Sequence, residues 1–495
     1  MTGTKKYPDI LVQLEPPSKF VKRMGTDNIH DYRTKFMRDR DIILYSKSFR
    51  RLSGKTQVFL TGSDDHMRTR LTHTLEVAQI ARTVASALKL NGDLTDAISL
   101  GHDLGHTPFG HVGERTLNFI MNGCEGFSAS ILPDKKGFKH NLQSTRIATQ
   151  LESKQPPEPY NCGLNLTNFT LFGMYHHSSP NWFKYDKDGG LKPCKFSQTS
   201  TEGLTCDIAN PSKTCLNYGN LEVNFYLDAK SEAYCLPDTH IPAWSFEAQI
   251  VAMSDEIAQR HHDLEDGLEA KLLSHDEVIN LLSPFSTKEN DPNFERMRGD
   301  KNTIYFSTSM SRFIVNMLVT ELIVTSSHNI ESFIKSNEID KDITVFEHIY
   351  PQLDVSTAEK IINFRDSFIL GHHDLEDYLK NRILNSFDVQ RMDGKGRFII
   401  RKLFKAYLAN PQQLRDKTII SLYEQYCPEA LKELNYTNND NRAKSIGALR
   451  NLLDTSRSSY STDANFKTHL LRTICDYISG MTDAFAIQEY HRLYG

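Results

Sequence analysis

The chain has 495 residues, of which 39% are hydrophobic, and its formal net charge at pH 7 is −4. This composition is that of a soluble globular protein with one large core or two to three domains. The N-terminus lacks the apolar region of a signal peptide, and the longest apolar-rich stretch, residues 313–325, is shorter than the roughly 20 residues that span a bilayer. We therefore expect a cytoplasmic protein without a membrane partner.

The N-terminal part of the chain is basic. From Lys19 to Arg70 there are 13 Lys and Arg but only 6 Asp and Glu. Such an excess of positive charge suits an anionic ligand, although a solvated basic surface explains it equally well. We expect this N-terminal segment, residues 1–65, to contribute to a substrate site.

Apolar periodicity predicts a series of helices from residue 71 onward. The first spans residues 71–88. The second begins with Asp93 as its N-cap and ends near Gly105, because Pro108 disfavours helical geometry at the residue before it. Further helices are predicted at 114–122, 143–151 and 244–260.

Residues 178–243 lack a sustained period, which indicates an irregular insertion with short strands near 221–226. Four of the eight cysteines lie in this stretch, and no CxxC spacing occurs. Reduced thiols are therefore favoured over a zinc-stabilised insertion. Helical patterns return at 309–325, 356–369, 394–409 and 466–493. The prediction is a mainly α fold with a helical core at 66–275 and a helical C-terminal region at 276–495.

The segment 99–114 is dense in side chains that bind metals. His102 and His106 are four residues apart and are expected on one helix face, with Asp103 beside His102. This density favours a metal site over the alternative of a polar helix end with structural histidines. His106 can in addition stabilise charge on a phosphate.

The adjacent His102 and Asp103 resemble the signature of the HD superfamily. In that superfamily the metal site also draws one His from an earlier helix and one Asp from a later one, which implies His73 and Asp255 as the other ligands. Two His and two Asp suit Mg²⁺, Mn²⁺, Fe²⁺, Co²⁺ or Ni²⁺ better than a structural Zn²⁺. Four protein ligands leave room on an octahedral ion for a water and a phosphate oxygen.

Groups suited to acid/base chemistry and to phosphate binding flank this quartet. His111 and Glu114 are about one helical turn apart and form a candidate general acid/base pair. The alternative is that Glu114 only caps its helix. The candidate phosphate ligands are His140, Asn141, Arg70 and Lys195. For either of the two cations taken alone, a solvated surface charge is the simpler interpretation.

Ordered motifs spread over residues 20–490 resemble the bacterial deoxyguanosine triphosphate triphosphohydrolase family, which belongs to the HD superfamily. The motifs are FRRLSGKTQVF at 49–59, RLTH at 70–73, GHDLGH at 101–106, FGHVGE at 109–114, DLEDG at 263–267 and RMDGKGR at 391–397. The resemblance implies an HD helical core. It implies hydrolysis of a deoxynucleoside triphosphate, with dGTP favoured, at the α-phosphate to a deoxynucleoside and triphosphate. It also implies a homo-oligomer, with a hexamer favoured.

The resemblance further implies roles for single residues. His111 and Glu114 match the catalytic pair, and Gln57 and Asp263 match positions that contact the deoxyribose. The positions that match phosphate contacts are Arg70, Asn141 and Lys195.

Three positions depart from the family pattern. Where the family commonly carries the Lys and Tyr of a Lys-Tyr-Pro motif, which reach the phosphates, this chain has His176 and His177. A neutral His holds a polyphosphate less strongly than Lys, so the phosphate affinity is expected to depend more on pH. Where the family often has a Tyr near the sugar, this chain has Gln259. These three residues are candidate substrate contacts of this chain's own.

Two alternatives stay open at this point. The HD chemistry could serve a different nucleotide, as in a nucleotidase or a phosphodiesterase. The chain could instead be a regulator that responds to nucleotides or single-stranded DNA and has weak catalysis, which the basic stretch motivates. Single-stranded DNA or a nucleotide as an effector is also compatible with the hydrolase.

Overall fold

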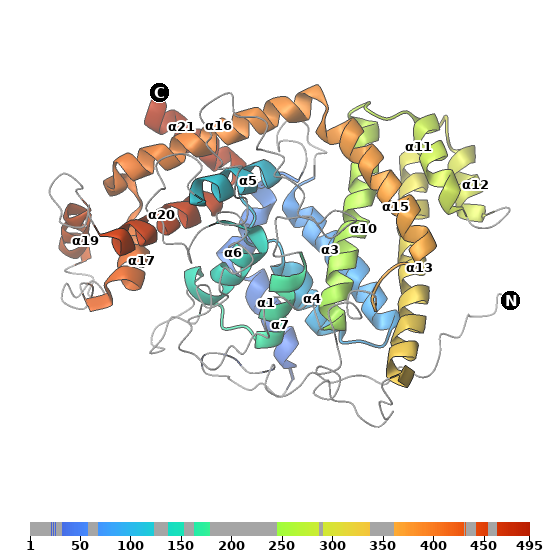
Figure 1. Ribbon diagram of the computed structural model, residues 1–495, viewed down its shortest axis with the longest axis horizontal. Helices are drawn as coiled ribbons and strands as arrows, with labels where there is room; N and C mark the ends of the chain where they lie inside the picture. Colours follow the sequence, from blue (N-terminus) through green and yellow to red (C-terminus); the bar gives the residue numbers. More distant parts are fainter. Residues whose placement is uncertain are drawn as a thin grey trace, which may run out of the picture.

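The computed structural model describes residues 21, 23, 25, 32–57, 68–122, 137–152, 163–178, 245–286, 291–336, 361–429, 431, 442–453 and 463–495. Within these residues the regular structure is helical, apart from two isolated bridges, so the predicted mainly α fold is confirmed (Figure 1). The predicted strands at 221–226, almost all of the predicted insertion and Lys195 lie outside the described residues. The predicted domain boundaries at residues 65 and 275 stay predictions.

A first group of helices surrounds α3 (Arg70–Ala87), which packs against α4 (Gly92–Gly101) and α10 (Phe246–Glu269). The long helix α13 (Phe306–Ser336) packs along α10 (Figure 1). The other helices of this group are α1 (Lys35–Leu44), α7 (Asn168–His176), α11 (His275–Leu282), α12 (Pro292–Gly299) and α15 (Asp366–Leu379).

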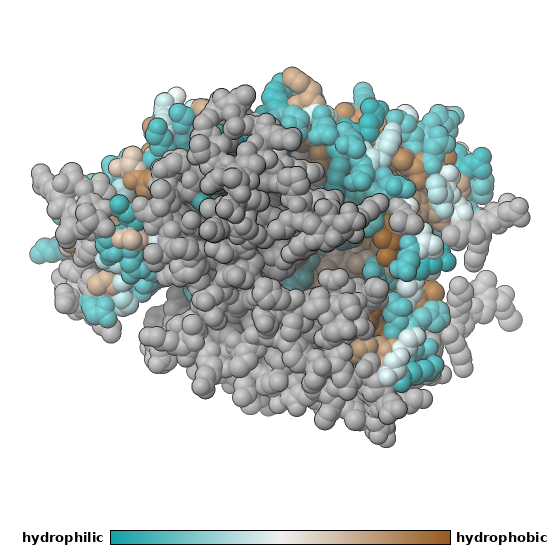
Figure 2. All heavy atoms as spheres, in the orientation of Figure 1, coloured by the Kyte–Doolittle hydropathy of each residue, from teal (hydrophilic) through white to brown (hydrophobic). Residues whose placement is uncertain are grey.

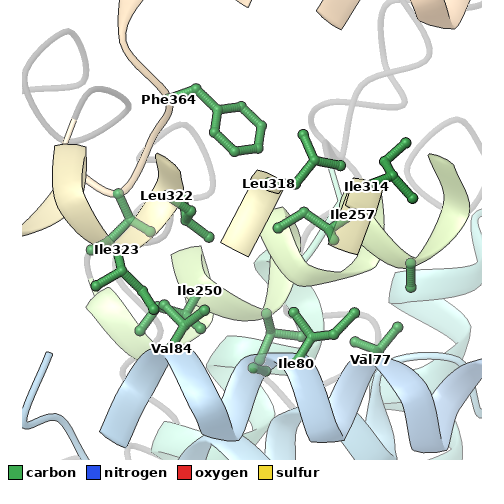
Figure 3. Packing of buried hydrophobic residues seen from close by; sticks show 14 of the residues in the cluster. Val77, Ile80, Val84, Ile250, Ile257, Ile314, Leu318, Leu322, Ile323 and Phe364 are labelled. Carbon is green, nitrogen blue, oxygen red and sulfur yellow. The ribbon is translucent and has the colours of Figure 1, made fainter. Parts of the chain in front are cut away.

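Apolar residues at helical spacing explain how this group packs. Val77, Ile80 and Val84 recur on one face of α3 and are buried. Figure 3 shows this row below Ile250 and Ile257 of α10, with the apolar face of α13 beyond. Each helix therefore buries an apolar stripe against the next, which fixes the position of α3 relative to α10.

A second group of helices forms its own apolar cluster. Its members are α5 (Gly110–Met121), α16 (Phe387–Ala409), α17 (Asp416–Tyr426), α19 (Arg442–Leu452), α20 (Ala464–Ser479) and α21 (Asp483–Tyr494). A smaller third cluster includes residues of α2 (Lys47–Arg51) and lies beside α6 (His140–Arg146), which continues into a π-helical turn, Ile147–Leu151. Short helical turns occur at Leu52–Gly54, Ser283–Phe285, Lys380–Leu384 and Pro411–Gln413. The chain between α4 and α5 joins the first two groups, so residues 102–109 lie at their junction.

Several predicted helix boundaries are wrong, for local reasons. The N-cap of α4 is Asn91, not Asp93, because the Asn91 side chain accepts the backbone N–H of Leu94 at 3.0 Å. The helix ends at Gly101, four residues before the predicted end. The segment predicted as one helix at 466–493 is two helices, because Thr482 caps a new one. Residues 361–365, predicted as helix, are not helical, and α15 begins at Asp366.

The helix α13 is longer than the predicted 309–325 segment. Its length and composition alone would allow it to cross a membrane. Its buried residues, among them Phe313, Ile314, Leu318 and Leu322, belong to the first apolar cluster, as expected of a core helix. In Figure 2 hydrophilic residues cover much of the coloured surface, with apolar residues visible toward the right, where α13 lies in Figure 1.

Candidate active site

The turn after α4 carries the first part of the candidate site. The prediction that His102 and His106 share a helix face is wrong, because α4 ends at Gly101. The turn nevertheless brings both imidazoles to one carboxylate. The Nε2 atoms of His102 and His106 lie 3.4 Å and 3.1 Å from Oδ1 of Asp103.

Hydrogen bonds to Ser144 of α6 hold this turn in place. The backbone N–H of Gly105 donates to the Ser144 hydroxyl at 2.8 Å, and that hydroxyl donates to the carbonyl of His102 at 2.6 Å. A Cβ at position 105 would overlap the carbonyl oxygen of His140 and the amide nitrogen of Ser144. Only glycine therefore allows α6 to approach the turn this closely.

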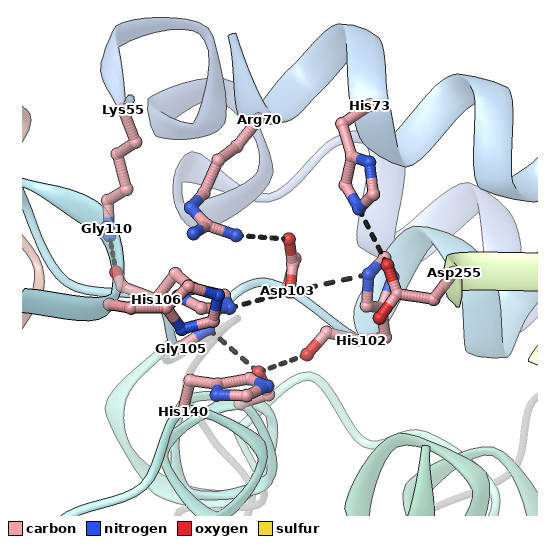
Figure 4. Close-up of polar contacts among 12 residues, drawn as sticks. Lys55, Arg70, His73, His102, Asp103, Gly105, His106, Gly110, His140 and Asp255 are labelled. Carbon is pink, nitrogen blue, oxygen red and sulfur yellow. Dashed lines mark hydrogen bonds and ion pairs between the residues drawn. The ribbon is translucent and has the colours of Figure 1, made fainter. Parts of the chain in front are cut away.

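The predicted metal quartet meets in space (Figure 4). His73 comes from α3 and Asp255 from α10, and the His73 Nε2 atom lies 2.9 Å from Oδ1 of Asp255. Ligand atoms of His73, His102 and Asp103 lie within 4.8 Å of one another. Four side chains from three separate segments thus converge on one point.

The hydrogen bonding of His102 shows that the quartet fits a divalent cation. Its Nδ1 lies 2.5 Å from the carbonyl oxygen of Ser99, which can only accept, so Nδ1 carries the proton. Nε2 lies on the side of Asp103, 3.4 Å from its Oδ1, and this buried nitrogen has no hydrogen-bond partner. With Nδ1 already used by the backbone, Nε2 and the carboxylate are the two groups of this turn placed to share a cation. A ligating His held by a backbone carbonyl is the arrangement expected at a metal.

Arg70 adds a buried positive charge beside the quartet. Its Nη1 donates to Oδ2 of Asp103 at 2.8 Å, and both side chains are nearly inaccessible. Burial raises the pKa of the Asp103 carboxyl, but His102, His106 and Arg70 outweigh it and hold that pKa well below its usual range. The Nε and Nη2 atoms of Arg70 are buried without a hydrogen-bond partner. These two donors are therefore available to a ligand.

Glu114 links the predicted catalytic pair to α6. Its Oε2 lies 3.4 Å from Nδ1 of His111, and its Oε1 accepts the backbone N–H of His140 at 2.8 Å. Burial raises the pKa of the Glu114 carboxyl, but His140 and His111 lower that pKa by more than burial raises it. The pKa is therefore well below its usual value, and the carboxylate is ionised. Glu114 is thus more than a cap of its own helix, because it orients His111, whose side chain is 57% exposed.

His140 is bonded at both ring nitrogens. Nδ1 lies 2.8 Å from the Glu114 carboxylate, and Nε2 lies 3.1 Å from Nε2 of His177. Nδ1 of His177 is 2.7 Å from the carbonyl of Met174, so it carries a proton there. Burial lowers the pKa of His177 to about 3, which keeps that ring neutral and makes its Nε2 an acceptor. His140 thus lies between an acceptor at each ring nitrogen, and its ring stacks on that of His106 with the centroids 4.0 Å apart.

A cavity of about 290 Å³ brings most of these side chains together. The predicted site residues that line it are Gln57, Arg70, His73, Asp103, His106, His111, His140, His177, Asp255 and Gln259. A larger cavity of about 410 Å³ between α2, α17 and α20 contains none of the predicted metal ligands. The chemistry of the lining, not the volume, therefore identifies the candidate active site.

Five predicted site residues do not line this cavity. His102 and Glu114 are buried and contact lining residues: His102 lies beside Asp103, and Glu114 is bonded to His111 and His140. The Asn141 amide donates to the carbonyls of Tyr175 and Ser178. The ring of His176 packs on Phe172 instead of turning toward the cavity, and Asp263 pairs with Arg260 at 3.7 Å.

Other lining residues were missed by the sequence reasoning. Ala252, Glu256 and Arg260 lie on α10 at intervals of four residues, on the helix face that also carries Asp255 and Gln259. The helical period could therefore have predicted them from the sequence. Glu376 of α15 also lines the cavity and pairs with Arg260 at 2.9 Å. No local pattern connects it to residues more than a hundred positions earlier.

Comparison with known proteins adds two family models. The HD domain model matches residues 70–159, and the phosphohydrolase-associated domain model matches residues 448–492. Proteins named deoxyguanosinetriphosphate triphosphohydrolase-like protein match nearly the whole chain. The one from Bartonella tribocorum is 31% identical and covers 95% of this chain and 92% of its own length. The one from Geobacter sulfurreducens is 31% identical over 95% of this chain and 91% of its own length.

Proposed function

The chain belongs to the family of deoxyguanosinetriphosphate triphosphohydrolase-like proteins and is a metal-dependent HD-domain phosphohydrolase, and from this we propose that its substrate is a deoxynucleoside triphosphate, with dGTP favoured. The proposed reaction is attack of water on the α-phosphorus. The bond from that phosphorus to the 5′-oxygen breaks, and the products are a deoxynucleoside and intact triphosphate.

The observation that carries this proposal is the buried, unpartnered Nε2 of His102 beside Asp103, in a ring whose Nδ1 is held by the carbonyl of Ser99. With His73 and Asp255 it supplies a quartet of N and O donors that suits Mg²⁺, Mn²⁺, Co²⁺, Ni²⁺ or Fe²⁺. Such an ion, when bound, polarises a phosphoryl oxygen and lowers the pKa of a bound water.

Arg70 and His140 are placed to bind the phosphates. The Nε and Nη2 atoms of Arg70 have no protein partner, while its Nη1 donates to Asp103 and so holds the guanidinium in place. His140 is held by Glu114 and lines the same cavity. Phosphoryl transfer is catalysed largely by positioning and charge neutralisation, so these two residues would hold the oxygens of the triphosphate in line for attack. Lys195 is proposed as a further phosphate contact on the resemblance alone.

His111 is proposed as the general acid. Glu114 bonds its Nδ1, which leaves Nε2 on the opposite side of the ring, and the imidazole lines the cavity. A protonated His111 would give its proton to the 5′-oxygen as the bond to phosphorus breaks. The ionised Glu114 stabilises the imidazolium before that transfer.

Contacts to the deoxyribose are proposed for Gln57 and Asp263. Gln57 lines the cavity, and its Oε1 atom is buried without a hydrogen-bond partner. A buried acceptor of this kind favours a substrate that offers it a donor, such as the 3′-hydroxyl of the sugar. We also propose a homo-oligomer, with a hexamer favoured, in the cytoplasm. A nucleotide or single-stranded DNA is a further proposed effector.

The test is to incubate the purified protein with each dNTP and rNTP in Mg²⁺, Mn²⁺ or Co²⁺ and identify the phosphate product by phosphorus NMR. Triphosphate from dNTPs, and its loss in His102→Ala and Asp103→Ala, is the expected result. Release of pyrophosphate or single phosphates would instead favour the nucleotidase or phosphodiesterase alternative. Binding of single-stranded DNA without turnover of any nucleotide would favour a regulator.

A further inference from the structure

A chain of hydrogen bonds lies behind His73, on the side away from Asp255. Nδ1 of His73 is 3.3 Å from Nδ1 of His262, a buried residue of α10. Nε2 of His262 is bonded in turn to Oε2 of Glu76, one turn after His73 on α3. Neither His262 nor Glu76 is among the residues that line the catalytic cavity. This chain of hydrogen bonds therefore runs from the cavity wall through the interface of α3 and α10 toward solvent.

The chemistry of the three groups fixes where the protons lie. A carboxylate only accepts, so the bond to Glu76 places a proton of His262 on its Nε2. Nδ1 of His262 is then free to accept from Nδ1 of His73 across the 3.3 Å contact. In that arrangement Nε2 of His73 keeps its lone pair on the side of Asp255 and His102, where a bound cation would take it. This is the tautomer that a metal ligand must have.

The same residues could in principle hold a second metal, since ligand atoms of Glu76, His261 and His262 lie within 4.8 Å of one another. The surrounding charge argues against it. Nε of Arg68 lies 3.4 Å from Oε1 of Glu76, and the same guanidinium is paired with Glu265. A divalent cation at Glu76 would stand beside this positive charge, whereas a neutral imidazole does not.

We propose that Glu76 and His262 are positioning residues for the metal ligand His73: Glu76 fixes the tautomer of His262, and His262 fixes the tautomer and ring orientation of His73. The inference rests on the proposed function, because it takes His73 to be a ligand. Neither residue touches substrate. Their role is to keep the Nε2 lone pair of His73 available and aimed into the quartet.

The matched variants are Glu76→Gln and Glu265→Gln. Both remove one negative charge beside Arg68, but only Glu76 is bonded to His262, while Glu265 is bonded to Arg68 and His261. Binding of Mn²⁺ is measured by the electron paramagnetic resonance signal of the free ion, with no nucleotide present. Loss of an outer partner of a metal-ligating His typically costs 10–100-fold in metal affinity. We expect that loss in Glu76→Gln and less than about threefold in Glu265→Gln.

Two further measurements separate positioning from a general structural effect. In Glu76→Gln, activity should recover toward the wild-type kcat at saturating Mn²⁺, because the residues that contact substrate are unchanged. Nitrogen NMR of the Mg²⁺-loaded wild type should show the proton of His73 on Nδ1, and Glu76→Gln should show a mixture of tautomers. His262→Asn, whose shorter side chain cannot bridge His73 and Glu76, should lose affinity as Glu76→Gln does.

The outcomes distinguish this inference from the metal site on which it rests. Unchanged Mn²⁺ affinity in Glu76→Gln and His262→Asn, with binding lost in His102→Ala, would refute the positioning role and leave the proposed function intact. Equal Mn²⁺ binding by wild type and His102→Ala would refute the metal quartet itself. A wild type that binds two Mn²⁺ per chain, and a Glu76→Gln variant that binds one, would show a second metal site and overturn the positioning role.

Discussion

Replacement of Arg70 by Met tests the charge balance of the site. Arg70 and Asp103 are 2% and 4% exposed and are joined by a bond of 2.8 Å. Met keeps most of the packing of the aliphatic stem but leaves the Asp103 carboxylate without its partner. Removal of one member of a buried pair costs about 3–5 kcal/mol, because an uncompensated charge remains. We expect this loss in the free energy of unfolding of Arg70→Met in EDTA.

Two features of the structure refine that expectation. A metal bound by Asp103 would take over the role of partner, so Mn²⁺ should restore part of the lost stability. The two free donors of Arg70 are placed to hold phosphate oxygens, and loss of a donor aimed at developing charge costs roughly 10²–10³-fold in rate. Release of triphosphate should therefore fall by that factor even at saturating Mn²⁺.

Urea unfolding with and without Mn²⁺, together with the rate of triphosphate release, measures both effects. The control is Arg82→Met on the same helix, since Arg82 pairs with Asp96 but is 50% exposed. An exposed pair contributes about 1 kcal/mol at most, and Arg82 is remote from the cavity lining. If Arg70→Met unfolds like Arg82→Met in EDTA, or keeps a rate within threefold of wild type, the assigned role of Arg70 is wrong.

Two further predictions concern the frame around the site. Gly105→Ala should lower both stability and Mn²⁺ affinity, because the added Cβ would overlap backbone atoms of His140 and Ser144; differential scanning calorimetry and metal titration measure this, and a wild-type melting temperature would contradict it. Burial raises the pKa of Asp263 to about 6, above the unfolded value of about 3.9. Because the folded pKa is raised, about 3 kcal/mol of stability that is present below pH 4 should be lost as the pH rises through 6. Asp263→Asn should flatten urea-unfolding stability between pH 4 and 7, and an unchanged profile would count against the burial of that charge.

The sequence predicted the helical fold well because most helices bury an apolar stripe with a clear period. Val77, Ile80 and Val84 are an example. Helix ends were harder to predict, since they depend on which polar side chain reaches a backbone N–H. Asn91 and Asp93 are both good N-caps, and only the packed structure shows that Asn91 accepts the bond.

Site residues that are close in the sequence could likewise be predicted, whereas those that only the packing of helices brings together could not. His102, Asp103 and His111 lie in one short segment, so their density alone drew attention to it. His73 and Asp255 needed the resemblance to a known superfamily, because no spacing rule links residues on separate helices. Glu376 could not be predicted, because its approach to Arg260 depends on how α15 packs against α10.

The placement of charge along the cavity also suggests how a nucleotide lies in it. Arg70 and His140, the two proposed phosphate contacts, lie on the side of α3 and α6, with the metal ligands His73, His102 and Asp103. On the side of α10 and α15 the lining carries Glu256 and Glu376, and Arg260 there is already paired with Glu376 at 2.9 Å. Because carboxylates repel phosphates, the triphosphate should lie toward Arg70 and the base toward α15. The residues that decide base preference are then on α10 and α15, and not among the metal ligands.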